Sequence, residues 1–234
     1  MRKIKRVYFG CFFAIFFIST INFGCCSYID FQSSANFKEE SIILLTGFEN
    51  FSSYDINPSQ LIVESLNGQI IDGFEIKGIV LPVDFDRSIE NLTQAIEEYS
   101  PIFVISFGLD AGTNKIDVEK LSINLKKDPK NVNIFKFLPR LIDPGSPFFR
   151  PSTLKTKEMI EDLKDANIPT KLSFFAGTYV CNSVFYQTIN YIDENNLDII
   201  SGFVHVPLLD SQSLDGMPLE TMIDASTIII KSNL

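Results

Sequence analysis

Histidine and cysteine are scarce in this sequence, and tryptophan is absent. The 234 residues contain one histidine, His205, and four cysteines. Three of the cysteines, at positions 11, 25 and 26, belong to the first 26 residues, so Cys181 is the single thiol of the remaining chain. That scarcity excludes an intramolecular disulfide in the body of the protein and a Cys/His zinc site. We expect no metal and no cofactor.

Basic residues are also in short supply. The chain has 20 lysines and arginines against 29 aspartates and glutamates, and the four charges before Ser27 are all basic. The rest of the chain therefore holds 16 basic and 29 acidic residues, a net charge of −13. A surface this acidic repels phosphate backbones, which argues against nucleic acid as a partner.

The first 26 residues have the pattern of a targeting segment. Four basic residues precede an apolar run at 7–23, which ends at Gly24-Cys25-Cys26. This order is typical of a secretory signal. Because it ends at Gly-Cys, it also resembles a bacterial lipoprotein signal, in which Cys25 or Cys26 would carry the lipid. We therefore expect an exported protein, anchored to a membrane by a lipid. A plain secretory signal, an uncleaved anchor and a cytoplasmic protein with a non-functional segment are the alternatives.

The remaining chain divides into a polar tether at 27–40 and one domain at 41–234. Apolar runs of the kind buried in parallel sheets alternate with segments of helical period. A long proline-rich surface segment at 126–151 interrupts this alternation. The pattern predicts an α/β fold, a single α/β/α sandwich around a mostly parallel twisted sheet. The expected strands are 42–45, 74–83, 102–105, 116–124, 171–175 and 199–206, and the expected helices start near 58, 86, 153 and 181.

Cys181 has the surroundings of a nucleophile. An expected buried strand at 171–175 enters a turn at Gly177, and apolar residues recur at helical spacing after the cysteine. A cysteine at a helix N-terminus is stabilised as the thiolate by the unpaired N–H groups and the helix dipole. The alternative is a buried cysteine that serves as a small apolar filler.

His205 and Glu119 are the candidate partners of this thiol. His205 lies near the end of the expected strand 199–206, and Glu119 lies beyond the turn after the third strand, so both fall near the edge where active sites gather in such folds. Taken singly, His205 could be a core histidine and Glu119 a solvated carboxylate. Together they supply the base and the orienting acid that a cysteine nucleophile needs.

Five sequence blocks resemble the pyroglutamyl peptidase type I family, in the family's order and spacing. They cover the domain from about residue 41 to 212. The blocks are Thr46-Gly47-Phe48-Glu49-Asn50-Phe51 with Ile56-Asn57-Pro58-Ser59, Leu81-Pro82-Val83, Ile116-Asp117-Val118-Glu119-Lys120 with Asn124, Ala176-Gly177-Thr178-Tyr179-Val180-Cys181-Asn182, and Gly202-Phe203-Val204-His205-Val206-Pro207.

This resemblance implies a cysteine peptidase that removes an N-terminal pyroglutamyl residue from peptides through a thioacyl-enzyme. It implies Cys181 as nucleophile, His205 as base and Glu119 as orienting acid. It also implies that the lactam ring is bound by Phe48, Phe51, Ile116 and Val180, and that the protein forms a homo-oligomer, commonly a tetramer in the family.

Two features depart from the family pattern. Bacterial members usually have Gly-Gln-Ala-Gly-Gly-Arg where this chain has Gly108-Leu109-Asp110-Ala111-Gly112-Thr113. The family is also normally cytoplasmic, whereas this chain begins with a signal-like segment. These departures leave two rival hypotheses: an exported binding lipoprotein with little turnover, and a cysteine amidase acting on another small lactam or acyl amide.

Overall fold

The computed structural model describes residues 41–51, 54–127 and 138–234. The expected signal at 1–26, its lipidation at Cys25 or Cys26, and the expected tether at 27–40 lie outside these residues. Within the described ranges, every helix is too short or too polar to span a bilayer.

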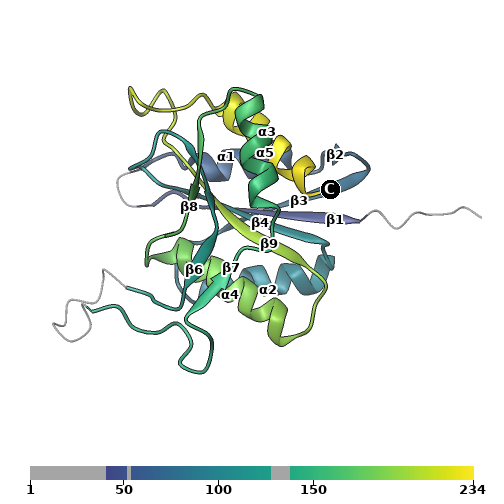
Figure 1. Ribbon diagram of the computed structural model, residues 1–234, viewed down its shortest axis with the longest axis vertical. Helices are drawn as coiled ribbons and strands as arrows, with labels where there is room; N and C mark the ends of the chain where they lie inside the picture. Colours follow the sequence, from purple (N-terminus) through teal and green to yellow (C-terminus); the bar gives the residue numbers. More distant parts are fainter. Residues whose placement is uncertain (1–40, 52–53, 128–137) are drawn as a thin grey trace, which may run out of the picture. The chain divides into compact units, whose positions relative to one another are not determined.

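A seven-stranded sheet forms the centre of the domain, with strand order β2-β3-β1-β4-β9-β5-β8 (Figure 1). Strands β2 and β3 pair antiparallel, as do β5 and β9, and the other neighbours are parallel. The mostly parallel sheet expected from the sequence is confirmed. Its strands are β1 (Ile42–Phe48), β2 (Ile70–Ile71), β3 (Phe74–Leu81), β4 (Phe103–Leu109), β5 (Ile116–Glu119), β8 (Thr170–Ser173) and β9 (Ile200–Val206), and a separate ladder joins β6 (Leu121–Ile123) to β7 (Phe149–Pro151).

Helices cover both faces of the sheet, which confirms the expected α/β/α sandwich. Helices α1, α3 and α5 pack on one face, and α2 and α4 pack on the other (Figure 1). Each layer has its own apolar core against the sheet. The helices are α1 (Pro58–Leu66), α2 (Arg87–Tyr99), α3 (Thr156–Asp165), α4 (Val180–Glu194) and α5 (Leu219–Asn233).

The central strands are apolar because both of their faces are covered. Every residue of β4 is buried, and in β1 Ile43, Leu44 and Leu45 have no exposed surface. A parallel strand between two helical layers has no solvated face, so an uninterrupted apolar run fits it better than alternation does. This burial fixes the strand ends, and the strand ends position the candidate site.

Several sequence-based expectations about local structure were wrong. The strand expected to be buried at 171–175 is β8, which lies at the edge of the sheet, and the side chains of Phe174 and Phe175 that follow it are exposed. The extended segment at 116–124 is two strands, β5 and β6, in different sheets. Ala166, expected to face inward, is exposed at the C-cap of α3. Helix α5 was not expected at all.

The cap of α2 also differs from the expectation. Asp86 occupies the N-cap position, but its side chain makes no capping hydrogen bond. The carboxylate of Asp84 accepts instead from the backbone N–H groups of Asp86 at 3.1 Å and Arg87 at 3.0 Å. A carboxylate can cap from two residues further upstream because the turn brings it over the same unpaired N–H groups.

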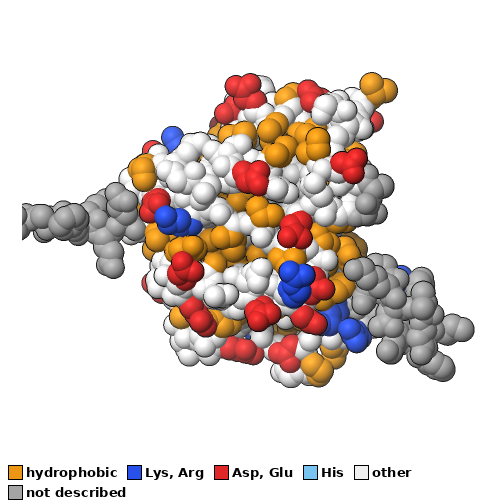
Figure 2. Space-filling view, turned by 180° about the vertical axis from the view of Figure 1, so that it is seen from behind, with side chains coloured by type: hydrophobic (Ala, Val, Ile, Leu, Met, Phe, Trp, Pro, Cys, Tyr) orange, Lys and Arg blue, Asp and Glu red, His pale blue; other side chains and the backbone are white. Residues whose placement is uncertain are grey.

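The surface agrees with the acidic composition. Acidic side chains are spread over the face shown in Figure 2, and lysine and arginine occur there in fewer places. Solvated like charges of this kind keep a protein soluble and oppose binding to polyanions.

Candidate active site

Cys181 lies in the first turn of α4, directly after a tight turn. Gly177 has φ +80°, a conformation that favours glycine because it lacks a Cβ. The helix begins at Val180, and the N-cap residue Tyr179 makes no side-chain capping hydrogen bond. The first-turn N–H groups of a helix have no partner within the helix. The local structure therefore directs backbone donors and the positive end of the helix dipole toward the region of the thiol.

Asn182 fixes the start of α4 to strand β6. Its side chain is fully buried and donates to the carbonyls of Ile123 and Leu125, both at 2.9 Å. Its Oδ1 accepts the N–H of Ile123 at 3.0 Å. An amide that satisfies three backbone groups resists rotation of the helix end. The neighbouring Cys181 is therefore held in one position.

Gly108 makes room for the thiol at the end of β4. A Cβ at this position would lie 2.9 Å from the Cys181 sulfur and 2.8 Å from the ring of Phe203. Carbon and sulfur atoms do not approach so closely without displacement. The glycine is therefore required for the thiol to occupy its observed place.

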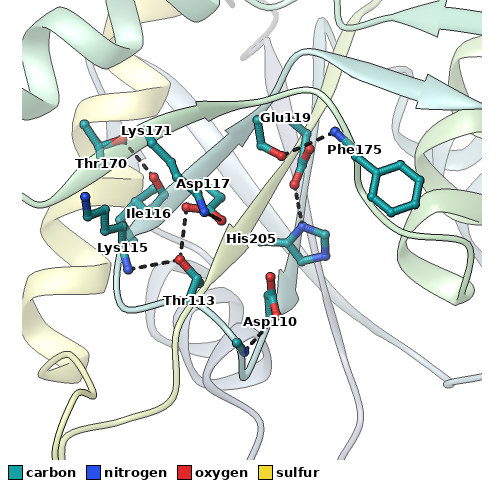
Figure 3. Close-up of polar contacts among 12 residues, drawn as sticks. Asp110, Thr113, Lys115, Ile116, Asp117, Glu119, Thr170, Lys171, Phe175 and His205 are labelled. Carbon is teal, nitrogen blue, oxygen red and sulfur yellow. Dashed lines mark hydrogen bonds and ion pairs between the residues drawn. The ribbon is translucent and has the colours of Figure 1, made fainter.

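His205 and Glu119 form a buried pair across two antiparallel strands. His205 is the last residue of β9 that pairs with β5. Its Nδ1 donates to Glu119 Oε1 at 2.8 Å (Figure 3). The two residues are 6% and 2% exposed. Since Nδ1 is engaged by the carboxylate, Nε2 is the ring nitrogen available to another partner.

Cys181 is the second partner of the imidazole. Burial lowers the pKa of His205, but a hydrogen bond with Cys181 and one with Glu119, together with the charges of both groups, outweigh it and raise the pKa to about 10. The imidazolium is thus the stable form at neutral pH. Residues distant in sequence therefore meet as a line of sulfur, imidazole and carboxylate, the arrangement that acts in nucleophilic catalysis.

A pocket of about 310 Å³ opens beside this line. Its lining is mostly apolar, and Cys181, His205 and Asp110 contribute the groups able to take part in chemistry or charge recognition. The lining residues are Phe51, Leu109, Asp110, Ala111, Phe175, Ala176, Gly177, Tyr179, Cys181 and His205.

The four residues expected to bind the lactam have different positions. Phe51 lines the pocket and is partly exposed. Phe48, Ile116 and Val180 are all buried, at 3%, 0% and 1% exposure, and none of them contributes to the pocket lining.

Sequence reasoning did not assign a role to several residues that build the pocket. Phe175, Tyr179 and Asp110 line it, and Tyr179 packs edge-on against Phe85 with ring centroids 5.4 Å apart. Tyr179 belongs to the same sequence block as Cys181, and Asp110 belongs to the departing turn at 108–113, so both segments had been singled out. Phe175 carried no such signal, because it was assigned to a buried strand.

A network at the start of α1 positions the segment that leads to Phe51. Asn57 caps the helix by accepting from the N–H of Ser59 at 3.1 Å, and its amide donates to the carbonyl of Glu49 at 3.0 Å. The hydroxyl of Ser59 accepts the N–H of Phe48 at 3.1 Å. These hydrogen bonds join the N-terminus of α1 to the end of β1 and so restrict the movement of both.

Comparison with known proteins identifies the family of this chain. Residues 41–234 match the model of the pyroglutamyl peptidase family. The pyrrolidone-carboxylate peptidase of Halalkalibacterium halodurans is 36% identical over 197 residues, which cover 82% of this chain and 98% of the relative. Pyrrolidone-carboxylate peptidase 2 of Caldanaerobacter subterraneus is 38% identical over 197 residues, which cover 81% of this chain and 94% of the relative.

Solved structures give the same result. The fold is similar to that of pyroglutamyl peptidase I from Bacillus amyloliquefaciens, with a TM-score of 0.77 and 29% identity over 83% of this chain and 97% of that one. The pyrrolidone carboxyl peptidase of Thermococcus litoralis has a TM-score of 0.76 and 29% identity, covering 82% and 93%. Since the family model matches residues 41–234 and the relatives are more than 30% identical over most of their length, this chain belongs to the pyroglutamyl peptidase family.

Proposed function

We propose that this protein is a cysteine peptidase that removes an N-terminal pyroglutamyl residue from peptides. The observation that carries the proposal is the continuous line formed by Cys181, His205 and Glu119 beside a mostly apolar pocket. A thiol, an imidazole and a carboxylate in this order are the components of a nucleophilic triad.

The first step forms the thioacyl-enzyme. The Cys181 thiolate attacks the carbonyl carbon that joins pyroglutamate to the next residue. Backbone N–H groups in the first turn of α4 stabilise the oxyanion, since they are fixed before the reaction and need no reorganisation. His205, charged at neutral pH, gives its proton to the leaving amine as the carbon–nitrogen bond breaks, and the shortened peptide departs.

The second step releases pyroglutamate. His205, now neutral, takes a proton from a water molecule that attacks the thioester carbonyl. The carbon–sulfur bond breaks, the thiolate returns, and the imidazolium again pairs with it. Glu119 holds the ring orientation through Nδ1 and stabilises its positive charge in both half-reactions.

The pocket suits a small uncharged ring. Pyroglutamate has no free amine, so apolar contact and a few backbone hydrogen bonds are enough to bind it. In this proposal Phe51 supplies the surface that contacts the ring, while Phe48, Ile116 and Val180 keep the buried positions observed and support the pocket from the core.

The test is turnover of a fluorogenic pyroglutamyl amide by the purified full-length protein, measured beside Cys181→Ser and Cys181→Ala. Wild type is expected to release the fluorophore, and both variants are expected to lose turnover while keeping the wild-type circular dichroism spectrum. Equal rates for wild type and Cys181→Ala would refute the nucleophile. Binding without turnover by the wild type would favour the binding-lipoprotein alternative, and turnover of other acyl amides alone would favour the amidase.

We further propose that residues 1–26 direct export and that Cys25 or Cys26 carries a lipid, with 27–40 as the tether. The basic start, the apolar run and Gly24-Cys25-Cys26 support this. A metabolically incorporated fatty acid should label the protein and disappear when both cysteines are changed to serine. A mature chain without label that lacks residues 1–24 would indicate a secreted protein, and an intact chain in the membrane fraction would indicate an uncleaved anchor.

We also propose that the protein forms a homo-oligomer, commonly a tetramer, as its family resemblance implies. Multi-angle light scattering of the purified protein measures the mass directly. A mass equal to one chain over the whole concentration range would refute this.

A further inference from the structure

Asp110 brings a carboxylate to the rim of the candidate active site. Among the described residues that line the pocket it is the single acidic one, and apart from Cys181, His205 and the Tyr179 phenol the other lining side chains are apolar. Figure 3 shows Asp110 and Glu119 on opposite sides of the imidazole. Glu119 is buried and engaged by His205, whereas Asp110 is exposed to solvent. The two carboxylates therefore face different environments.

The turn after β4 holds Asp110 in place. The backbone N–H of Asp110 donates to the carbonyl of Val206 at 3.0 Å, next to His205 on β9. Its Oδ1 accepts the N–H of Gly112 at 2.9 Å. The carboxylate is thus fixed on a short turn, and its position relative to the imidazole does not depend on a flexible loop.

The surroundings of the pocket add further negative charge. A hollow that shares Phe51 and Tyr179 with the pocket is lined by Glu49, Asp84 and Arg87. A second hollow, which shares Ala111 with the pocket, is lined by Asp215 and by no basic residue. Taken with Asp110, these charged side chains are four acids against one base.

We propose that Asp110 makes this peptidase prefer substrates with a cationic residue directly after pyroglutamate. This inference rests on the proposed function. The lactam ring is uncharged, so the carboxylate does not distinguish one pyroglutamyl ring from another. The side chain of the next residue begins a few bonds from the carbonyl that Cys181 attacks, and it leaves through the solvent-exposed rim where Asp110 lies. Charges closer than a Debye length, about 8 Å at physiological ionic strength, interact without full screening.

A structural role for Asp110 predicts a different result from a charge role. Asp110→Asn keeps an oxygen that can accept the Gly112 N–H, so the turn is preserved while the charge is removed. Asp224→Asn makes the same change of charge on α5, in a groove between α5 and residues 166–168 that shares no lining residue with the pocket, and is the matched control.

The experiment compares kcat/KM for three peptides, pyroglutamyl-Lys-Ala, pyroglutamyl-Ala-Ala and pyroglutamyl-Glu-Ala, by chromatography of the released dipeptide. Wild type and the Asp224→Asn control should prefer lysine over glutamate. In Asp110→Asn the lysine-to-glutamate ratio should fall about 3- to 10-fold, as expected for an exposed charge pair acting on both substrates. The alanyl peptide should change less than either charged one, and high salt should reduce the wild-type ratio.

Two results would overturn the inference while leaving the proposed function in place. One is an unchanged lysine-to-glutamate ratio in Asp110→Asn. The other is an equal loss for all three peptides, which would mean that Asp110 only shapes the turn. If the wild type turned over none of the three peptides, the proposed function and the inference would both fail.

Discussion

Two buried carboxylates on β5 lie two residues apart and have very different partners. Glu119 is 2% exposed and pairs with His205. Asp117 is 3% exposed and pairs with Lys171 of the edge strand, with 3.0 Å between Oδ2 and Nζ, and it also accepts from the hydroxyl of Thr113 at 3.2 Å. Figure 3 shows the two side chains along one strand. Burial alone therefore does not identify the candidate orienting acid.

The partner decides what each carboxylate can do. The second oxygen of Glu119, Oε2, is buried without a hydrogen-bond partner among the described residues. The imidazole of His205 is therefore the main group that offsets the cost of burying this carboxylate. This leaves its charge to act on His205, whose pKa it helps to raise. Both oxygens of Asp117 are engaged, and its cationic partner Lys171 is half exposed. One pair can serve catalysis, and the other ties the sheet edge together.

The largest effect is expected from removing the imidazole. His205→Asn retains an amide donor toward Glu119 but has no titratable base, so kcat should fall about 10³- to 10⁴-fold. Steady-state kinetics normalised to the folded fraction measure this. His205→Ala should add a loss of stability, because it leaves the buried charge of Glu119 unpaired. Retention of a tenth of the activity in His205→Asn would exclude the proton-transfer role.

Glu119→Gln should have a smaller effect than the histidine variants, about 10- to 10²-fold in kcat, since an amide still orients the ring but no longer stabilises its charge. It should also change the pH profile. The carboxylate helps to raise the His205 pKa to about 10, so removing its charge lowers that pKa. The alkaline limb of kcat against pH should move to lower pH. An unmoved limb would mean that Glu119 does not act through His205.

Asp117→Asn should leave kcat within about threefold of wild type, because Asp117 lies beside the line of catalytic groups and not in it. Its effect should appear in stability against pH. Burial is the main cause that raises the pKa of Asp117 above 3.8, so the folded state binds this proton more tightly than the unfolded state does. Wild type therefore loses stability relative to Asn as pH rises from 3.8 through the raised pKa. Urea denaturation at pH 4 and pH 7 measures the free energy of unfolding of both proteins. From pH 4 to pH 7 the Asn variant should become more stable relative to wild type, and a shift in favour of wild type would contradict the assignment.

Lys171→Met should have the smallest effect. The side chain of Lys171 is 52% exposed, so solvent partly screens this ion pair although Asp117 is buried, and the Thr113 hydroxyl still donates to Asp117 when the lysine is removed. Activity should remain at the wild-type level and the melting temperature should change by only a few degrees. A loss of activity comparable to that of Glu119→Gln would remove the contrast between the two carboxylates.

The sequence predicted the central part of the fold better than its edges. The apolar runs at Ile43–Leu45 and in β4 and β9 are buried on both faces, so pattern and structure agree. The run at 171–175 is equally apolar in its last residues, yet β8 is an edge strand and its side chains reach solvent. Apolarity reports that a segment can be buried, but its place in the sheet depends on pairing between distant strands.

The sequence by itself determined the residue types of the candidate site. A single histidine and a single thiol after residue 26, placed near strand and helix ends, left few other choices for a nucleophile and its base. The start of α4 next to Cys181 followed from helical spacing that local residues control.

Tertiary structure alone decided how these groups meet. The register of β5 and β9 places Asp117 directly opposite His205, yet His205 pairs diagonally with Glu119, because Lys171 and Thr113 engage both oxygens of Asp117. The place of Asp110 at the rim depends on a turn that hydrogen-bonds to β9. Such contacts join residues far apart in sequence, and their energies arise only once the sheet has formed, so no local pattern contains them.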